Sequence, residues 1–269
     1  MKTLPEIRIG HSPDPDDAFM FYGFASGQVK VPGHEIVHVL EDIQGLNERA
    51  AGDDPLEVTA MSVHAFLELG ARYRFLEVGT SVGRGYGPRL VGLEPKPVDA
   101  LAGARIALPG PKTTATLVAR FLLPAFDEVH LDFTEIMDAV CEGVVDAGVI
   151  IHEGQLTYAE HGLVLLGDFG EMFAERHGGL PLPLGLNCIR ADLSSELRRD
   201  VAQAYRRSVE IALTQREAAV DYALQFARGL DRALADRFVG MYVNEDSLSF
   251  HDELRRALHV LRTEYWNAC

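Results

Sequence analysis

The sequence predicts an α/β protein made of two lobes with a ligand-binding cleft between them. Short β-rich runs alternate with helical patterns as far as Gly170, which is typical of strands joined by crossover helices. Two stretches rich in proline and glycine interrupt the alternation, and from Ser194 onward the pattern is almost purely helical. Periodicity alone leaves one alternative open, a single continuous sheet followed by a long helical tail.

The first block of the chain contains three expected strands, at residues 6–11, 35–41 and 56–62. Each run is rich in β-branched or other apolar residues and leads into a helical pattern, at residues 16–27, 42–52 and 63–73. Because the strands are joined through helices, we expect them to be parallel.

A second block follows the stretch "LEPKPVDALAG" at residues 93–103, whose prolines and glycine predict a turn. Its expected strands and helices are residues 104–110, 113–126, 128–133, 135–143, 146–154 and 163–170. The second proline- and glycine-rich stretch, at residues 178–193, leads to the helical segment. We therefore expect a larger lobe of residues 1–95 and 187–269, which includes the C-terminal helices, and a smaller inserted lobe of residues 96–186.

Composition and charge exclude several classes of partner. The 269 residues carry a formal net charge of −15, so the surface should repel nucleic acid and anionic membranes, both of which need a basic footprint. A small anionic ligand can still bind, because hydrogen-bond donors close to it outweigh the repulsion from the net negative charge of the protein. The start "MKTLPEIRIG" has no apolar signal-peptide core, and Cys141, Cys188 and Cys269 have no metal or redox spacing. We expect a cytoplasmic protein, unless a leader has been trimmed from the chain.

The stretch "HSPDPDDAF" follows the first expected strand. Asp14 is expected to cap a helix that begins at Pro15, with Asp16 and Asp17 at the positive end of its dipole. The carboxyl end of a strand is also where α/β folds bind ligands. A well-capped helix without further function is the alternative, and a metal site is not indicated, because the spacing of the aspartates matches no hard-ion loop.

Two further loops contain potential ligand-binding groups. In "LPGPKTTATL", a turn precedes Lys112, Thr113 and Thr114 and then a helix. Backbone amides, hydroxyls and an ammonium there suit a carboxylate or phosphate, although a simple threonine N-cap explains the same residues. In "TSVGRGYGPRLV", Arg84 or Arg89 could pair with a carboxylate. Neither loop has the spacing of a nucleotide-binding motif.

His152 directly follows the apolar run "AGVII". If that run is a parallel strand, its carboxyl end presents the imidazole at the ligand side of the sheet. Imidazole is the side chain that accepts and returns a proton near neutral pH, so His152 is the candidate general base. A histidine with a structural role at a strand end is the alternative.

Seven of these segments together resemble a known family. The segments "HSPDPDDAFMFYG", "LEDIQGLNERA", "GRGYGP", "PGPKTTATL", "DAGVIIHEGQLTY", "GLPLPLG" and "YVNEDSLS" occur in this order. Their order and spacing are similar to those of the 1,4-dihydroxy-6-naphthoate synthases of the futalosine route to menaquinone. The resemblance implies the two-lobed fold of type II periplasmic binding proteins.

The resemblance also implies an activity. Family members act on cyclic dehypoxanthinylfutalosine and release 1,4-dihydroxy-6-naphthoate, a lyase-type reaction that implies no cofactor and no metal. His152 corresponds to the proposed base, and Asp42, Asn47, Ser62, Thr113 and Thr114 correspond to ligand-lining positions. The substrate is a small anionic aromatic molecule, and the expected oligomeric state is a monomer or a homodimer. The first loop departs from the family's S-P-C-P-N-D, because Asp14 and Asp16 replace a cysteine and an asparagine.

Three other functions share this fold and stay open. A solute-binding protein or a ligand sensor for a small aromatic carboxylate would use the same architecture without turnover, since a fold does not determine a function. Chorismate dehydratase is a distantly similar enzyme. The "IIHE" and "KTT" motifs favour the naphthoate synthase.

Overall fold

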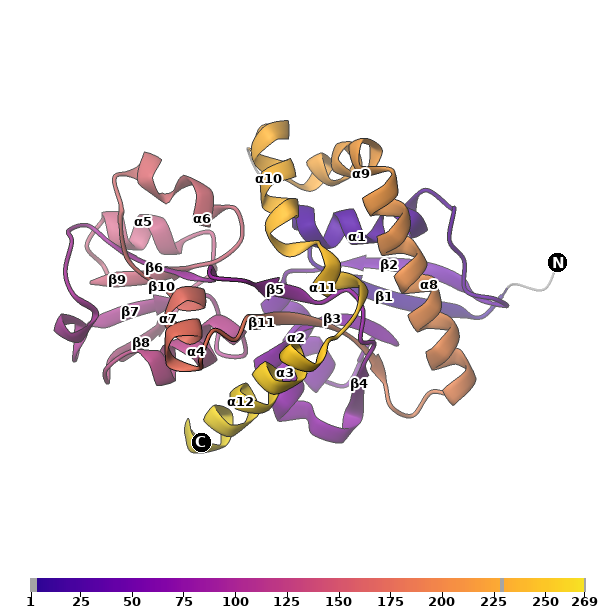
Figure 1. Ribbon diagram of the computed structural model, residues 1–269, viewed down its shortest axis with the longest axis horizontal. Helices are drawn as coiled ribbons and strands as arrows, with labels where there is room; N and C mark the ends of the chain where they lie inside the picture. Colours follow the sequence, from indigo (N-terminus) through magenta and orange to yellow (C-terminus); the bar gives the residue numbers. More distant parts are fainter. Residues whose placement is uncertain (1–3, 228–229, 269) are drawn as a thin grey trace. The chain divides into compact units, whose positions relative to one another are not determined.

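The chain forms two compact units with a sheet each. The computed structural model describes residues 4–227 and 230–268 (Figure 1). Unit 1 comprises the chain up to Val82 together with Gly185–His251, and unit 2 comprises Gly83–Leu184 together with the chain from Asp252 onward. The α/β alternation is confirmed, and the alternative of one continuous sheet is wrong, because the strands form two separate sheets.

The first sheet has the strand order β2-β1-β3-β11-β4, and β5 pairs with β11. These strands and the helices of unit 1 are β1 (Glu6–His11), α1 (Pro15–Ala25), β2 (Glu35–Leu40), α2 (Ile43–Ala51), β3 (Val58–Ser62), α3 (Val63–Leu69), β4 (Tyr73–Phe75), β5 (Ser81–Gly83), β11 (Leu182–Arg190), α8 (Ser195–Thr214), α9 (Arg216–Ala223), α10 (Arg232–Tyr242) and α11 (Glu245–Leu248). As expected, β1 is parallel to β2 and to β3. Their carboxyl ends therefore lie at one edge of the sheet.

The core of unit 1 surrounds α1. Phe19, Met20 and Phe21 of this helix are fully buried, and α1 packs against α8 and α9 (Figure 1). The approach to α8 is close, because a Cβ added at Gly23 would lie 2.6 Å from the Cα of Ser208. Burying each large apolar side chain stabilises the fold by about 1.5–3 kcal/mol, so α1 is a major source of stability for this unit.

The second sheet has the strand order β10-β6-β9-β7-β8. The elements of unit 2 are β6 (Arg89–Gly92), β7 (Arg105–Leu108), α4 (Thr114–Leu122), β8 (Asp127–His130), α5 (Ile136–Cys141), β9 (Ala147–Ile150), α6 (Gly154–Thr157), β10 (Val164–Asp168), α7 (Phe169–Arg176) and α12 (Asp252–Ala268). Strand β7 lies between β9 and β8 and is parallel to both. Three carboxyl ends therefore meet at one edge of this sheet as well.

The division of the chain differs from the boundaries expected at residues 95 and 187. Strand β6 belongs to the sheet of unit 2, so that unit begins before the turn at residues 93–103. The C-terminal helix α12, expected with the larger lobe, is grouped with unit 2 instead. Its buried Leu254, Ala257 and Leu261 recur at helical spacing, and the helix contacts α4.

Candidate active site

His152 lies just beyond the carboxyl end of a strand, as the sequence predicts. Strand β9 ends at Ile150 and is parallel to β7. The imidazole is half-buried. Its ring centroid lies 4.8 Å from that of Phe133, and the angle between the two ring planes is 70°. Phe133 follows β8, which is also parallel to β7. The same edge of the sheet thus supplies the histidine and the aromatic ring beside it.

The backbone of His152 has an uncommon conformation. Its φ of 56° is in the left-handed region, which among the described non-glycine residues is shared only with Glu77. For an L-residue this conformation costs roughly 1–2 kcal/mol, and such residues concentrate at functional sites, where the surrounding structure holds them. The backbone N–H of Gln155 donates to the carbonyl of His152 at 3.2 Å and closes the turn.

The turn with Thr113 and Thr114 follows β7, the strand next to β9. Thr113 is the N-cap of α4, and its hydroxyl oxygen accepts from the backbone N–H of Thr116. The Thr113 hydroxyl lies 3.0 Å from the carbonyl of Gly110, and the Thr114 hydroxyl donates to the carbonyl of Leu184 at 2.6 Å. The N-cap interpretation is therefore confirmed. The amino end of α4 and His152 lie at the same edge of one sheet.

The other three site residues that the resemblance implies are in unit 1. Asn47 and Ser62 contact each other twice, because the Asn47 amide donates to the Ser62 hydroxyl at 3.0 Å and accepts from the Ser62 backbone N–H at 2.9 Å. Both side chains are buried. Asp42 caps α2 by accepting from the backbone N–H groups of Gln44 and Gly45. Asp42 follows β2, and Ser62 is the last residue of β3; these strands are the two neighbours of β1.

The first loop of the chain follows β1, the strand between β2 and β3. Pro15 begins α1 as predicted, but Asp14, although at the N-cap position, makes no capping hydrogen bond with its side chain. Instead, the Asp17 carboxylate accepts the backbone N–H of Ser12 at 3.0 Å. The capping role predicted for Asp14 is therefore wrong, because a carboxylate three residues further along stabilises the loop.

Burial changes the ionisation of this loop. The pKa of Asp16 is raised well above its usual range by burial and by the neighbouring Asp17 and Asp14 carboxylates. Its carboxyl oxygen is 3.4 Å from the Ser81 hydroxyl. Burial also lowers the pKa of His11 to about 4. The imidazole stacks on Phe21 at 3.9 Å, and its Nδ1 lies 2.9 Å from the carbonyl of Ser12, so the neutral ring carries its proton on Nδ1.

The two arginines of the glycine-rich loop have different environments. Arg84 forms an exposed ion pair with Glu253 at 2.9 Å. Arg89 points inward, where its Nη1 donates to the carbonyl of Gln155 and its Nε lies 3.5 Å from the carboxylate of Asp168. Sequence reasoning missed both Gln155 and Asp168. Only Asp168 gives a local signal, an acidic residue directly before a helix, and it does cap α7.

Within residues 4–227 and 230–268, no three side chains of the metal-ligating types come together. No helix in that part of the chain is both long and apolar enough to cross a membrane. Cys141 and Cys188 are not in disulfides, whereas Cys269 lies outside the described residues.

Comparison with solved structures defines the class of protein. The alkanesulfonate-binding protein SsuA of Xanthomonas axonopodis pv. citri superimposes with a TM-score of 0.73 at 15% identity, over 100% of this chain and 94% of that chain. The fold is therefore that of the periplasmic binding proteins. A crystal structure of a protein from Archaeoglobus fulgidus is much more similar, with a TM-score of 0.92 and 43% identity over 97% of each chain.

Comparison with sequences identifies the family within this class. The chain belongs to the menaquinone biosynthesis family, whose model matches residues 7–265. The 1,4-dihydroxy-6-naphthoate synthase of Thermus thermophilus is 40% identical over 97% of this chain and 94% of that protein. The enzyme of the same name from Streptomyces coelicolor is 36% identical over 96% and 92%.

Proposed function

We propose that this chain is a 1,4-dihydroxy-6-naphthoate synthase, which releases the naphthoate from cyclic dehypoxanthinylfutalosine. The observation that carries the proposal is the similarity to two enzymes of that name over nearly the full length of each. The placement of His152 at the carboxyl edge of a sheet supports it, because this is where α/β proteins position reacting groups.

His152 acts as the general base in this proposal. Its imidazole removes a proton from the sugar-derived part of the substrate, and the adjoining C–C bond then breaks in a retro-aldol-like step. The electron pair of that bond passes to the bicyclic part, where formation of the aromatic naphthoate ring favours the forward direction. Phe133 restricts the orientation of the imidazole through its ring contact.

The amino end of α4 binds the substrate carboxylate. The first amides of a helix have no intrahelical acceptor, and the helix dipole favours an anion there. The hydroxyls of Thr113 and Thr114 donate to main-chain carbonyls, so their role is to fix this helix start rather than to bind the anion directly. In unit 1, Asp42, Asn47 and Ser62 are the proposed substrate-binding residues, and the Asn47–Ser62 pair fixes two of them rigidly.

The test of the base is replacement of His152 by asparagine, which tolerates the left-handed conformation but cannot act as the base. We expect naphthoate release, followed by liquid chromatography, to fall at least ~100-fold, because a positioned base contributes about 10²–10⁴-fold. Thermal stabilisation by the product should remain. Wild-type turnover in the His152→Asn variant would refute the assignment of the base.

The same assay separates the proposal from its alternatives. Naphthoate release by the unmodified protein supports the synthase. Thermal stabilisation by naphthoate without release supports a binding protein or sensor. Turnover of chorismate in place of the futalosine derivative supports the dehydratase.

A further inference from the structure

The unusual backbone of His152 needs a structural support, and Arg89 is placed to provide it. Arg89 is the first residue of β6, and it pairs directly with Ile150 of β9 and with Asp168 of β10. Ile150 is the last residue of β9, and His152 follows two residues later. The arginine therefore begins the strand beside the one from which the histidine turn leaves the sheet.

Three contacts direct the Arg89 side chain toward this turn. Its Nη1 donates to the carbonyl of Gln155 at 2.5 Å, and its guanidinium carbon lies 5.5 Å from the ring centroid of Tyr158. Its Nε lies 3.5 Å from the carboxylate of Asp168. The arginine side chain is 21% exposed and that of Asp168 is 4% exposed. The contacts are thus shielded from water and are stronger than an exposed pair would be.

One ion pair and two hydrogen bonds form a continuous path from Asp168 to His152. One oxygen of Asp168 accepts the backbone N–H groups of Gly170 and Glu171, which fixes the carboxylate at the start of α7, while the other oxygen faces Arg89. Arg89 then binds the Gln155 carbonyl, and the Gln155 N–H binds the His152 carbonyl. Both backbone polar groups of Gln155, its N–H and its carbonyl, are therefore part of this path.

We propose that Arg89 is a positioning residue, which fixes the turn of residues 152–155 and thereby the direction of the His152 imidazole. This inference rests on the proposed role of His152 as the base. A planar guanidinium can contact a carbonyl, a carboxylate and an aromatic ring at once, whereas an ammonium is a point charge on a flexible chain. Lysine at this position would keep the charge and lose the geometry.

The test compares Arg89→Lys with a matched control, Arg232→Lys, because Arg232 belongs to unit 1 and its ion pair with Asp221 has both side chains more than half exposed. We expect kcat of the Arg89→Lys variant to fall about 10- to 100-fold with KM changed less than about threefold, because small misplacements of a catalytic group reduce the rate by such factors. The Arg232→Lys variant should retain wild-type kcat. Added guanidinium, below denaturing concentration, should restore part of the activity of Arg89→Ala but not of His152→Asn.

A second measurement is independent of turnover. In an NMR spectrum of the protein with isotope-labelled histidines, the imidazole cross-peak that disappears in His152→Asn belongs to the His152 ring. We expect this cross-peak to shift or broaden in Arg89→Lys and to stay unchanged in Arg232→Lys. An unchanged cross-peak in a folded Arg89→Lys protein overturns the proposal, whatever the activity. A shifted cross-peak together with full activity of His152→Asn would support the positioning role and refute the base instead.

Discussion

At the scale of single residues, burial determines how the first loop responds to pH. His11 is fully buried, and its pKa is lowered to about 4. In the unfolded chain the imidazole gains a proton near pH 6.5, whereas in the folded chain it stays neutral down to about pH 4. The unfolded state therefore binds more protons between these values, and stability is lost as the pH falls from 6.5 toward 4.

Replacing His11 by phenylalanine should remove this pH dependence. We expect the wild-type protein to lose about 2 kcal/mol more of its free energy of unfolding than the variant between pH 7 and pH 5, a figure that follows from the pKa difference. Phenylalanine keeps the stacking on Phe21. Urea unfolding of both proteins at the two pH values measures the difference, and equal losses in the two proteins would contradict the explanation.

Asp16 has the opposite effect on the stability profile. Because burial raises its pKa, the folded chain holds a proton that the unfolded chain releases near its ordinary pKa. Its contribution to stability is therefore present at low pH and is lost as the pH rises toward the raised value. Burial of Asp16 thus makes folding less favourable as the pH rises above the ordinary pKa of this carboxyl group.

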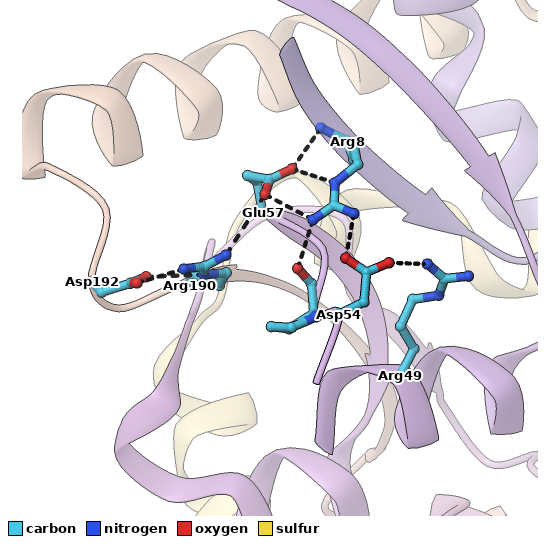
Figure 2. Close-up of polar contacts among 7 residues, drawn as sticks. Arg8, Arg49, Asp54, Glu57, Arg190 and Asp192 are labelled. Atoms are coloured by element: carbon cyan, nitrogen blue, oxygen red, sulfur yellow. Dashed lines mark hydrogen bonds and ion pairs between the residues drawn. The ribbon is translucent and has the colours of Figure 1, made fainter. Parts of the chain in front are cut away.

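At the scale of secondary-structure elements, an ion-pair network joins β1, β11 and the segment before β3 (Figure 2). The Arg8 guanidinium donates to both carboxylate oxygens of Glu57 and to Asp54. Arg49 and Arg190 extend the network. Burial alone would raise the pKa of Glu57, but hydrogen bonds from Arg8 outweigh that effect and lower it. This network is at the amino end of β3, opposite the edge with Ser62.

Removing Arg8 should destabilise unit 1. We expect Arg8→Met to lower the free energy of unfolding by about 2 kcal/mol, because Glu57 would lose its charged hydrogen-bond donors while remaining largely buried. The matched control is Arg232→Met, since Arg232 and Asp221 form an ion pair with both side chains more than half exposed. That change should leave the free energy of unfolding nearly unchanged, because exposed ion pairs contribute little to stability. Urea unfolding measures both, and similar small effects would show that the network contributes little.

The elements differ in how well the sequence predicts them. The strands with continuous apolar runs are in the expected places, and the position of His152 follows from the end of β9. The sequence does not predict strand β11, because it lies in a stretch rich in proline and glycine, which have poor strand propensity. The strand forms because its burial in the sheet outweighs that propensity. The role of Arg89 gives no local signal, since its partners come from the turn after β9 and from β10.

At the scale of the whole molecule, the acidic composition predicts a response to salt. The net charge of −15 implies self-repulsion in the folded state, which added salt screens. We expect the melting temperature at pH 7 to rise as sodium chloride increases from about 0.01 to about 0.1 M, over which the Debye length falls from about 30 to about 10 Å. The same increase in sodium chloride at a pH near the isoelectric point of about 5.0 should change the melting temperature much less. A fall in melting temperature at pH 7 would show that attractive pairs dominate.

Neither unit is a continuous piece of chain. Unit 1 resumes after Leu184, and unit 2 resumes at Asp252 with α12. During synthesis, the sheet of unit 2 therefore emerges from the ribosome well before the helix that covers α4. Until that helix is made, the apolar surface beneath Leu254 and Leu261 is open to chaperones and to other nascent chains, so shortening the protein from its C-terminal side should first cause aggregation of the half that contains His152.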